Sequence, residues 1–365
     1  MVYAYEEPLA KLWNVSYSML PTLLGYEKNL MKVDERLLEL LEQDEYFTSI
    51  GGTFIDVPGN KLHINVLSDA IDVVKHNLES KFQQDSHLFV FKPVKNSIAA
   101  LVHTFGQILN ITKRLKPLVI TCYISAESNY VFLKSYQQYD EQNRGFFDAI
   151  RQISQYNETV KHHNVPSIPN TQPSFVETNN MEIDAIGTRI LAGDGVYNKD
   201  LQGRCSLGFW AKSKDLKSTY IVTSGHCSTN ESQSFYHCKW NENVCVDLIG
   251  SMKFKRSYPL DAGLISIDNK KIIELFDTVV AINNVDSEQN DELTVYDGTE
   301  SSSNGAHICK SGYATHVTCG KIIAFNGFFI NKEQLLAYPL TFSTAKSGVS
   351  DSGGPVFSYK PDLKQ

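Results

Sequence analysis

The sequence predicts two domains, an α+β domain followed by an all-β domain, joined by a polar linker. Three observations predict this layout. Helical and strand patterns interleave up to residue 157, a proline-punctuated polar stretch follows, and short β-rich runs fill the remainder. At 365 residues the chain is long enough for more than one core. The expected division is an N-terminal extension (1–30), the α+β domain (31–157), a linker with a processing region (158–187) and the β domain (188–365).

The N-terminal elements follow from their hydrophobic periods. Residues 34–45 repeat leucines at helical spacing, and two alternating strands at 53–57 and 61–66 flank a Pro-Gly-Asn turn, which is typical of a hairpin. Ser68 and Asp69 are candidate caps of a helix that continues to about Glu79. The other expected elements are helices over 96–110 and 145–156 and strands over 88–91, 118–124 and 130–133.

The C-terminal half has a different composition and a different hydrophobic pattern. Turns rich in Gly, Asn, Ser and Asp separate short β-rich runs, which is typical of a barrel or a sandwich. One short stretch, 270–276, has a helical period. The expected strands cover 206–210, 219–224, 262–267, 278–282, 321–325 and 336–342.

Composition excludes several classes of partner. The formal net charge is −7 and the pI about 5.8, so no global basic field attracts nucleic acid. No apolar run is long enough to span a bilayer, and residues 1–30 lack the pattern of a signal peptide. We therefore expect neither nucleic acid nor membrane as a partner.

The cysteines indicate an oxidising compartment. Six of the seven lie in the C-terminal half, and only Cys122 lies outside it. An even, clustered set of cysteines favours disulfides, although a cytosolic protein with free thiols is the alternative.

Three segments carry candidate chemistry, in the chain order histidine, aspartate, serine. Residues 221–227 read as a strand that ends on His226, residues 259–265 place Asp261 at the mouth of an apolar strand, and residues 347–356 hold Ser352 in a glycine-rich turn. A serine hydroxyl needs a neighbouring base to become a nucleophile, and that base needs a partner that fixes its tautomer. Each segment alone is more often structural, but their conjunction predicts a Ser352–His226–Asp261 catalytic triad.

These segments resemble chymotrypsin-fold serine proteases, specifically the branch of alpha-lytic protease and the streptogrisins. Residues 223–227 are similar to that branch's T-A-G-H-C box with Ser for Ala, and the resemblance covers about 186–358. It implies an all-β double barrel and a trypsin-like serine endopeptidase that acts on peptides or proteins without a cofactor. Residues 190–193 look like the start of the mature enzyme.

The resemblance also implies disulfide pairs. It implies a Cys205–Cys227 bridge that holds the histidine loop and a second bridge, Cys309–Cys319. Cys238 and Cys245 could bind a metal together with His237, but no C-x-x-C pair or fourth ligand accompanies them. We expect a small-loop disulfide between these two cysteines and no metal site.

The N-terminal half resembles the same family in a shorter stretch. Residues 51–66 are similar to the hairpin of the propeptides of these enzymes, which act as folding catalysts and inhibitors and are then cut away. The resemblance implies a secreted zymogen whose own propeptide is an intramolecular partner. The alternative is a generic α+β domain.

The carboxylate next to the nucleophile predicts a further pairing. Asp351 would be buried, and an unpaired buried carboxylate is costly. In the branch that this chain resembles, the basic residue after the first cysteine of the second bridge supplies the cation, which nominates Lys310. The alternative is that Lys310 is a solvated surface residue.

Two departures from the family matter. Ser350 replaces a glycine whose N–H, together with that of Ser352, is expected to form the oxyanion hole. Few residues follow Ser352, so we expect a second barrel that is truncated at the C-terminus and lacks a wall of the specificity pocket. These departures keep open an alternative function, a catalytically inactive protease-like binding or regulatory protein.

Overall fold

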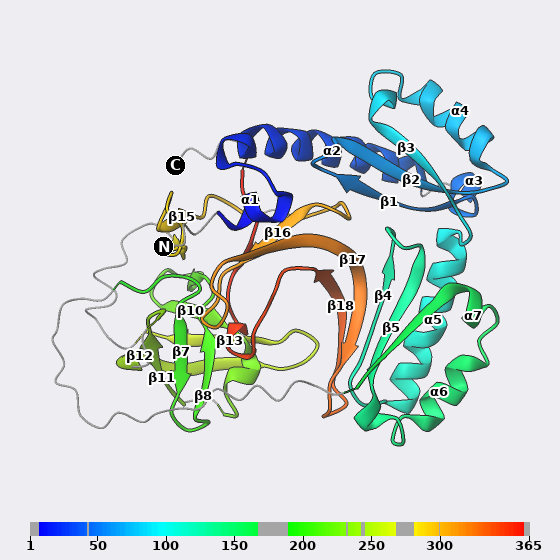
Figure 1. The fold of residues 1–365 in the computed structure, drawn as a ribbon. Helices are drawn as coiled ribbons and strands as arrows, with labels where there is room; N and C mark the ends of the chain where they lie inside the picture. Colours follow the sequence, from blue (N-terminus) through cyan, green and yellow to red (C-terminus); the bar gives the residue numbers. More distant parts are fainter. Residues whose placement is uncertain are drawn as a thin grey trace.

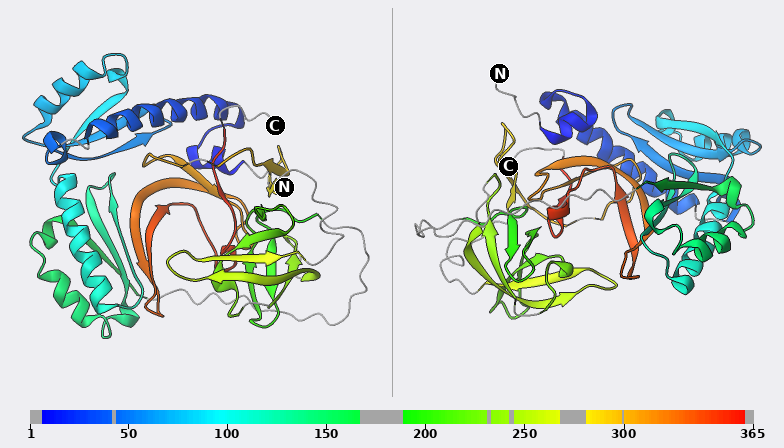
Figure 2. Two further views of the ribbon diagram at one scale, coloured as in Figure 1. Left: turned by 180° about the vertical axis from the view of Figure 1, so that it is seen from behind. Right: turned by 60° about the horizontal axis from the view of Figure 1, so that its bottom comes forward.

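The computed structural model describes residues 7–41, 44–166, 189–230, 233–241, 245–267, 281–298 and 300–360. The helix expected at 270–276 and most of the strand expected at 278–282 lie outside these ranges. The N-terminal helices and sheets form one side of the molecule and the sheet of residues 195–266 the other, with a long curved strand between them (Figures 1 and 2).

The chain opens with two helices, α1 (Pro8–Trp13) and α2 (Leu20–Leu41), followed by the single turn α3 (Asp44–Phe47). Helix α2 begins well before the helix expected at 34–45. Its buried stripe includes two acids, Glu27 and Asp34, which interrupt the hydrophobic period that marks a helix in the sequence.

A three-stranded sheet packs under α2. Strands β1 (Ile50–Asp56) and β2 (Lys61–Leu67) form the expected antiparallel hairpin, and β3 (Phe89–Val94) pairs parallel with β2 after the crossover helix α4 (Ile71–Lys81). The residue before α4 is Ala70, and no side chain caps this helix. The expected capping by Ser68 and Asp69 is therefore wrong.

A second helical layer covers three further strands (Figure 1). Strand β6 lies in the range that the sequence predicts as linker, where it pairs parallel with β5. None of the described helices is both long and apolar enough to cross a membrane. The elements are β4 (Ile120–Ser125), β5 (Tyr130–Tyr136), β6 (Val160–Val165), α5 (Ile98–Leu115), α6 (Arg144–Arg151) and α7 (Tyr156–Thr159).

The β-rich half begins with a seven-stranded sheet in the order β8-β7-β11-β12-β13-β10-β9. Apolar side chains that include Leu207, Ile221, Phe235 and Ile265 form its core. The strands are β7 (Gly195–Asn198), β8 (Gly203–Ser206), β9 (Trp210–Lys212), β10 (Thr219–Thr223), β11 (Ser234–Cys238), β12 (Cys245–Arg256) and β13 (Ala262–Ser266).

The last strands join the two halves of the molecule. Strand β17 pairs with β16 and β18, and its end also pairs with β4, where Phe328 lies opposite Cys122. One sheet therefore runs β19-β16-β17-β4-β5-β6 across the expected domain boundary. The strands are β14 (Ala281–Asn283), β15 (Glu292–Thr294), β16 (His307–Lys310), β17 (Thr318–Ile330), β18 (Leu336–Ser343) and β19 (Val356–Phe357).

Candidate active site

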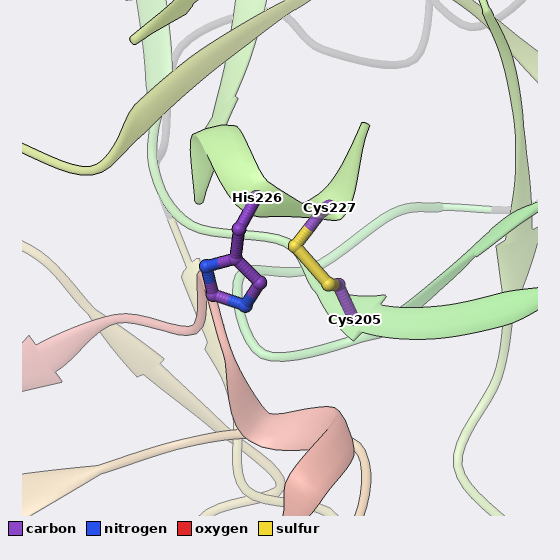
Figure 3. Close-up of side chains that lie close together, drawn as sticks. All are labelled: Cys205, His226 and Cys227. Carbon is purple, nitrogen blue, oxygen red and sulfur yellow. A yellow bond between two sulfur atoms is a disulfide. The ribbon is translucent and has the colours of Figure 1, made fainter. Parts of the chain in front are cut away.

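His226 lies on a single 3-10 turn, Gly225–Cys227, directly after strand β10. Cys227 forms a disulfide with Cys205 of β8, which ties this turn to the neighbouring strand. The ring of His226 extends from the turn alongside the disulfide (Figure 3). The disulfide therefore holds in place the turn that carries the imidazole.

Asp261 holds His226 through two hydrogen bonds. It directly precedes β13, and the pairing of β13 with β10 brings it to the histidine turn. The His226 backbone N–H donates to Asp261 Oδ1 at 2.9 Å, and ring atom Nδ1 bonds Oδ2. Burial raises the pKa of Asp261, but the hydrogen bonds from His226 outweigh it and hold this pKa below its ordinary value. With Nδ1 bonded to the carboxylate, Nε2 is left to act as a base.

Exposure separates this pair from the other histidine–carboxylate pairs of the described residues. The side chains of the pairs His237–Asp194 and His307–Glu27 are at most 5% exposed, whereas those of His226 and Asp261 are 54% and 38% exposed. A third pair, His316–Asp286, is of intermediate exposure, and its imidazole stacks on Trp240. The imidazole of His226 is therefore accessible from solvent.

The turn that carries Ser352 is seated against the same strands. The Ser206 N–H donates to the Ser352 carbonyl at 2.8 Å, and Cys227 Sγ lies 4.0 Å from that carbonyl oxygen. Gly353 has φ +92°, and a Cβ there would lie 2.3 Å from Thr223 Oγ1. Only glycine fits this position, so the glycine after Ser352 allows the turn to approach β8 and β10 closely.

Within these described segments, no hydrogen bond links the Ser352 hydroxyl to His226. The structure brings the backbone of Ser352 next to the histidine turn and leaves the serine–histidine contact unmade. Such contacts are often long before substrate binds.

Ser206 organises the serine turn and was not singled out from the sequence. Its hydroxyl accepts from the Tyr313 N–H at 2.8 Å and donates to the Ser350 carbonyl, also at 2.8 Å. Ser350 itself is buried in the 3-10 turn Val349–Asp351. The position of Ser206 directly after Cys205 is the one sequence signal that could have indicated this role.

Asp351 is a buried, fully bonded carboxylate. Lys310 Nζ lies 2.9 Å from its Oδ2, and the N–H groups of Gly348, Ala314 and Thr315 also donate to it. Burial raises the pKa of Asp351, but the hydrogen bonds from Thr315 and Lys310 outweigh it and keep the pKa below its ordinary value. For Lys310, burial lowers the pKa and the ion pair opposes the shift only in part. The cation that the sequence nominated for Asp351 therefore lies against this carboxylate.

No protein-family model matches the chain, and no curated protein matches it. Solved structures do resemble it. Thermobifida fusca protease A is 25% identical, with 47% of this chain and 78% of that chain covered, at a TM-score of 0.36. A Nocardiopsis protease is 23% identical, with 47% of this chain and 79% of that chain covered, at a TM-score of 0.37. Cellulomonas bogoriensis chymotrypsin is 20% identical, with 47% of this chain and 78% of that chain covered, at a TM-score of 0.35.

The solved structures that this chain resembles are chymotrypsin-fold serine proteases, and they include a homologue of alpha-lytic protease. The likeness covers about half of this chain. Because the TM-scores lie below 0.5, the likeness carries no conclusion about function, and the chemistry of the site follows from its own side chains.

The cysteines near the site are paired with one another. Besides Cys205–Cys227, disulfides join Cys238 with Cys245 and Cys309 with Cys319, and each of these two spans neighbouring strands. Cys122 is free and buried in β4. The three disulfides therefore link elements of the β-rich half covalently.

The disulfides also bear on metal binding. Cys205, Cys227 and His226 place three potential ligand atoms within 4.8 Å of one another (Figure 3). The two sulfur atoms are bonded to each other, so they are not thiolates and cannot bind a metal in this state. His237 Nε2 forms a hydrogen bond with the Asp194 carboxylate, and the sulfur atoms of Cys238 and Cys245 are bonded to each other. The alternative that these three residues bind a metal is therefore not supported.

Proposed function

We propose that this chain is the precursor of a secreted serine endopeptidase that cleaves peptides or proteins. One observation carries the proposal: a solvent-accessible imidazole, oriented by a carboxylate, lies beside the turn of a serine that is followed by a glycine. This combination provides the base, its orienting partner and the nucleophile that acyl transfer to serine requires.

In the proposed mechanism, His226 Nε2 takes the Ser352 hydroxyl proton as Ser352 Oγ attacks the carbonyl carbon of the scissile bond. Asp261 keeps the Nδ1 proton in place and stabilises the imidazolium that forms. The imidazolium then protonates the leaving amine, the peptide C–N bond breaks, and an acyl–Ser352 ester remains. Water attacks this ester with His226 again as base, which releases the acid and restores the serine.

The oxyanion of the tetrahedral intermediate would be held by the backbone N–H groups of Ser350 and Ser352. The buried Lys310–Asp351 ion pair supports this role, because Asp351 lies between Ser350 and Ser352 in the sequence and the ion pair holds their turn in place. The carboxylate is thereby neutralised without a new N-terminus, so cutting the chain is not needed to supply its cation.

The N-terminal half would serve as the prosegment of this zymogen. Its β1–β2 hairpin and the three disulfides of the β-rich half support a secreted precursor that folds in an oxidising compartment. The substrate would be the peptide bond of another protein or peptide.

A fluorophosphonate probe tests the proposal, because it reacts only with a serine activated for nucleophilic attack. We expect labelling of the wild type, no labelling of Ser352→Ala or His226→Ala, and full labelling of the exposed control Ser218→Ala. A wild type that stays unlabelled, both intact and after the linker is cut, would contradict peptidase activity.

Two observations favour a second candidate, a catalytically inactive protease-like binding or regulatory protein. The Ser352 hydroxyl makes no hydrogen bond to His226 in the described chain, and Ser350 replaces the expected glycine. Peptide binding by a folded wild type that resists the probe would select this candidate.

A further inference from the structure

The loop between strands β16 and β17 surrounds the cation that pairs with Asp351. Lys310, the last residue of β16, carries an ammonium group with three N–H donors. One donates to the Asp351 carboxylate, and the others donate to the Thr315 hydroxyl and to the His316 carbonyl, which lies 2.9 Å from Nζ. Two of the three acceptors belong to the loop, so the position of the loop decides where this cation lies.

The same loop contacts the carboxylate directly. The N–H groups of Ala314 and Thr315 donate to Asp351 Oδ1 at 2.8 and 3.1 Å, and the Thr315 hydroxyl donates to Oδ2. Asp351 directly precedes the proposed nucleophile, Ser352. A displacement of the loop would therefore reach the serine turn through both members of the ion pair.

His316 is in a backbone conformation that most residues avoid. Its φ is +52°, in the left-handed region, which is uncommon for residues other than glycine and is entered most often by asparagine, aspartate and histidine. The Cys309–Cys319 disulfide joins β16 to β17 and fixes only the base of the loop. A strained conformation persists where the surrounding structure holds it, so the contacts of the His316 side chain become decisive.

The His316 side chain makes those contacts with two other parts of the β-rich half. Its Nδ1 donates to the carboxylate of Asp286, which lies between β14 and β15. Its ring stacks on Trp240, between β11 and β12, with the ring centroids 4.1 Å apart and 2° between the ring planes. Trp240 is itself held in place, because its Nε1–H donates to the Gly193 carbonyl at 2.8 Å. The imidazole thus ties the loop to two elements outside it.

We propose that His316 is a positioning residue for the nucleophile. Its side chain holds the loop in the conformation that keeps Lys310 against Asp351, and the ion pair in turn fixes the turn of Ser352. His316 acts through its own backbone carbonyl and not by contact with substrate. The inference rests on the proposed function, because it assigns His316 to the same serine.

A series of variants at position 316 separates the side-chain contacts from the backbone strain. His316→Gly adopts the left-handed conformation freely but loses Asp286 and Trp240, so the rate of fluorophosphonate labelling should fall about tenfold or more. His316→Asn tolerates the same conformation and places its amide nitrogen where Nδ1 lies, so it should regain much of the rate. His316→Gln, whose amide lies at the Nε2 position, should not. Labelling of His316→Gly at the wild-type rate would overturn the proposal.

A double variant tests whether His316 and Asp286 act as a unit. Adding Asp286→Ala to His316→Gly should slow labelling no further than His316→Gly alone, because the second change removes a contact that is already lost. Losses that multiply would contradict the pairing. His103→Ala, at an exposed position of helix α5, is the control and should label at the wild-type rate.

Amide hydrogen exchange in the Ser352→Ala background makes the test independent of peptidase activity. The N–H groups of Ala314 and Thr315 should exchange about tenfold faster once His316→Gly is added, because the loop that presents them to Asp351 opens more often. Unchanged exchange would overturn the positioning role. Faster exchange in a protein whose wild type is never labelled would instead keep this role and overturn the proposed function alone.

Discussion

Lys310 Nζ lies 2.9 Å from Asp351 Oδ2, and Asp351 is the residue directly before Ser352. The side chains are 11% and 2% exposed. Solvent therefore screens the pair little, and the serine turn depends on it.

Lys310→Ala is expected to destabilise the protein by about 3 kcal/mol, because it leaves a buried carboxylate without its cation. The four other hydrogen bonds to Asp351 keep the cost at this lower end. Urea unfolding followed by tryptophan fluorescence measures the change. The exposed control Lys332→Ala should unfold at the wild-type midpoint, and an unchanged midpoint for Lys310→Ala would refute the pairing.

Asp34→Asn is expected to stabilise the protein in neutral and alkaline solution. Asp34 is 0% exposed, and burial raises its pKa above the ordinary 3.8, a shift that the nearby Ser303 and Thr53 hydroxyls oppose only in part. An acid with a raised pKa in the folded state contributes fully below pH 3.8 and loses that contribution as pH rises through the folded pKa, at about 1.4 kcal/mol per pH unit.

Urea unfolding of Asp34→Asn and wild type at pH 4 and pH 8 checks this sign. The advantage of the variant should be small at pH 4 and about 1–2 kcal/mol at pH 8. The exposed neighbour Glu35→Gln should show no such trend. An advantage that is larger at pH 4 would contradict the raised pKa of Asp34.

Ser206→Ala is expected to lower kcat about 10- to 100-fold with little change in KM. The hydroxyl holds the Ser350 carbonyl, so its loss misplaces the nucleophile turn without touching bound substrate. Steady-state kinetics on a peptide substrate measure both constants. If KM rises and kcat stays at the wild-type value, Ser206 contacts substrate and does not position the turn.

Replacing both Cys205 and Cys227 by alanine is expected to cost about 3 kcal/mol, because the disulfide closes a loop with a sequence separation of 22. It should also slow probe labelling, since the histidine turn loses its brace. Thermal unfolding measures the first effect. The Cys238–Cys245 disulfide closes a loop of sequence separation 7 between β11 and β12 and does not include the histidine turn, so replacing both of these cysteines by alanine should leave the labelling rate near the wild-type value.

The sequence alone determined the features that local pattern specifies. The β1–β2 hairpin follows from two runs of alternating apolar and polar residues around Pro-Gly-Asn. The candidate residues His226, Asp261 and Ser352 follow from short motifs that occur in the chain order histidine, aspartate, serine. Such features need only neighbours along the chain, because turn chemistry and strand periodicity act over a few residues.

The tertiary structure decided what depends on distant partners. The sequence predicts only the last part of helix α2, because Glu27 looks exposed in the sequence, and only its hydrogen bonds to His307 of β16 explain why an acid is buried there. The positioning role of Ser206 depends on the contact between β8 and the turn that carries Ser352, which the sequence does not show. The pairing of β17 with β4 joined the halves that composition had separated, because strand pairing between residues so far apart leaves no periodic trace in either segment.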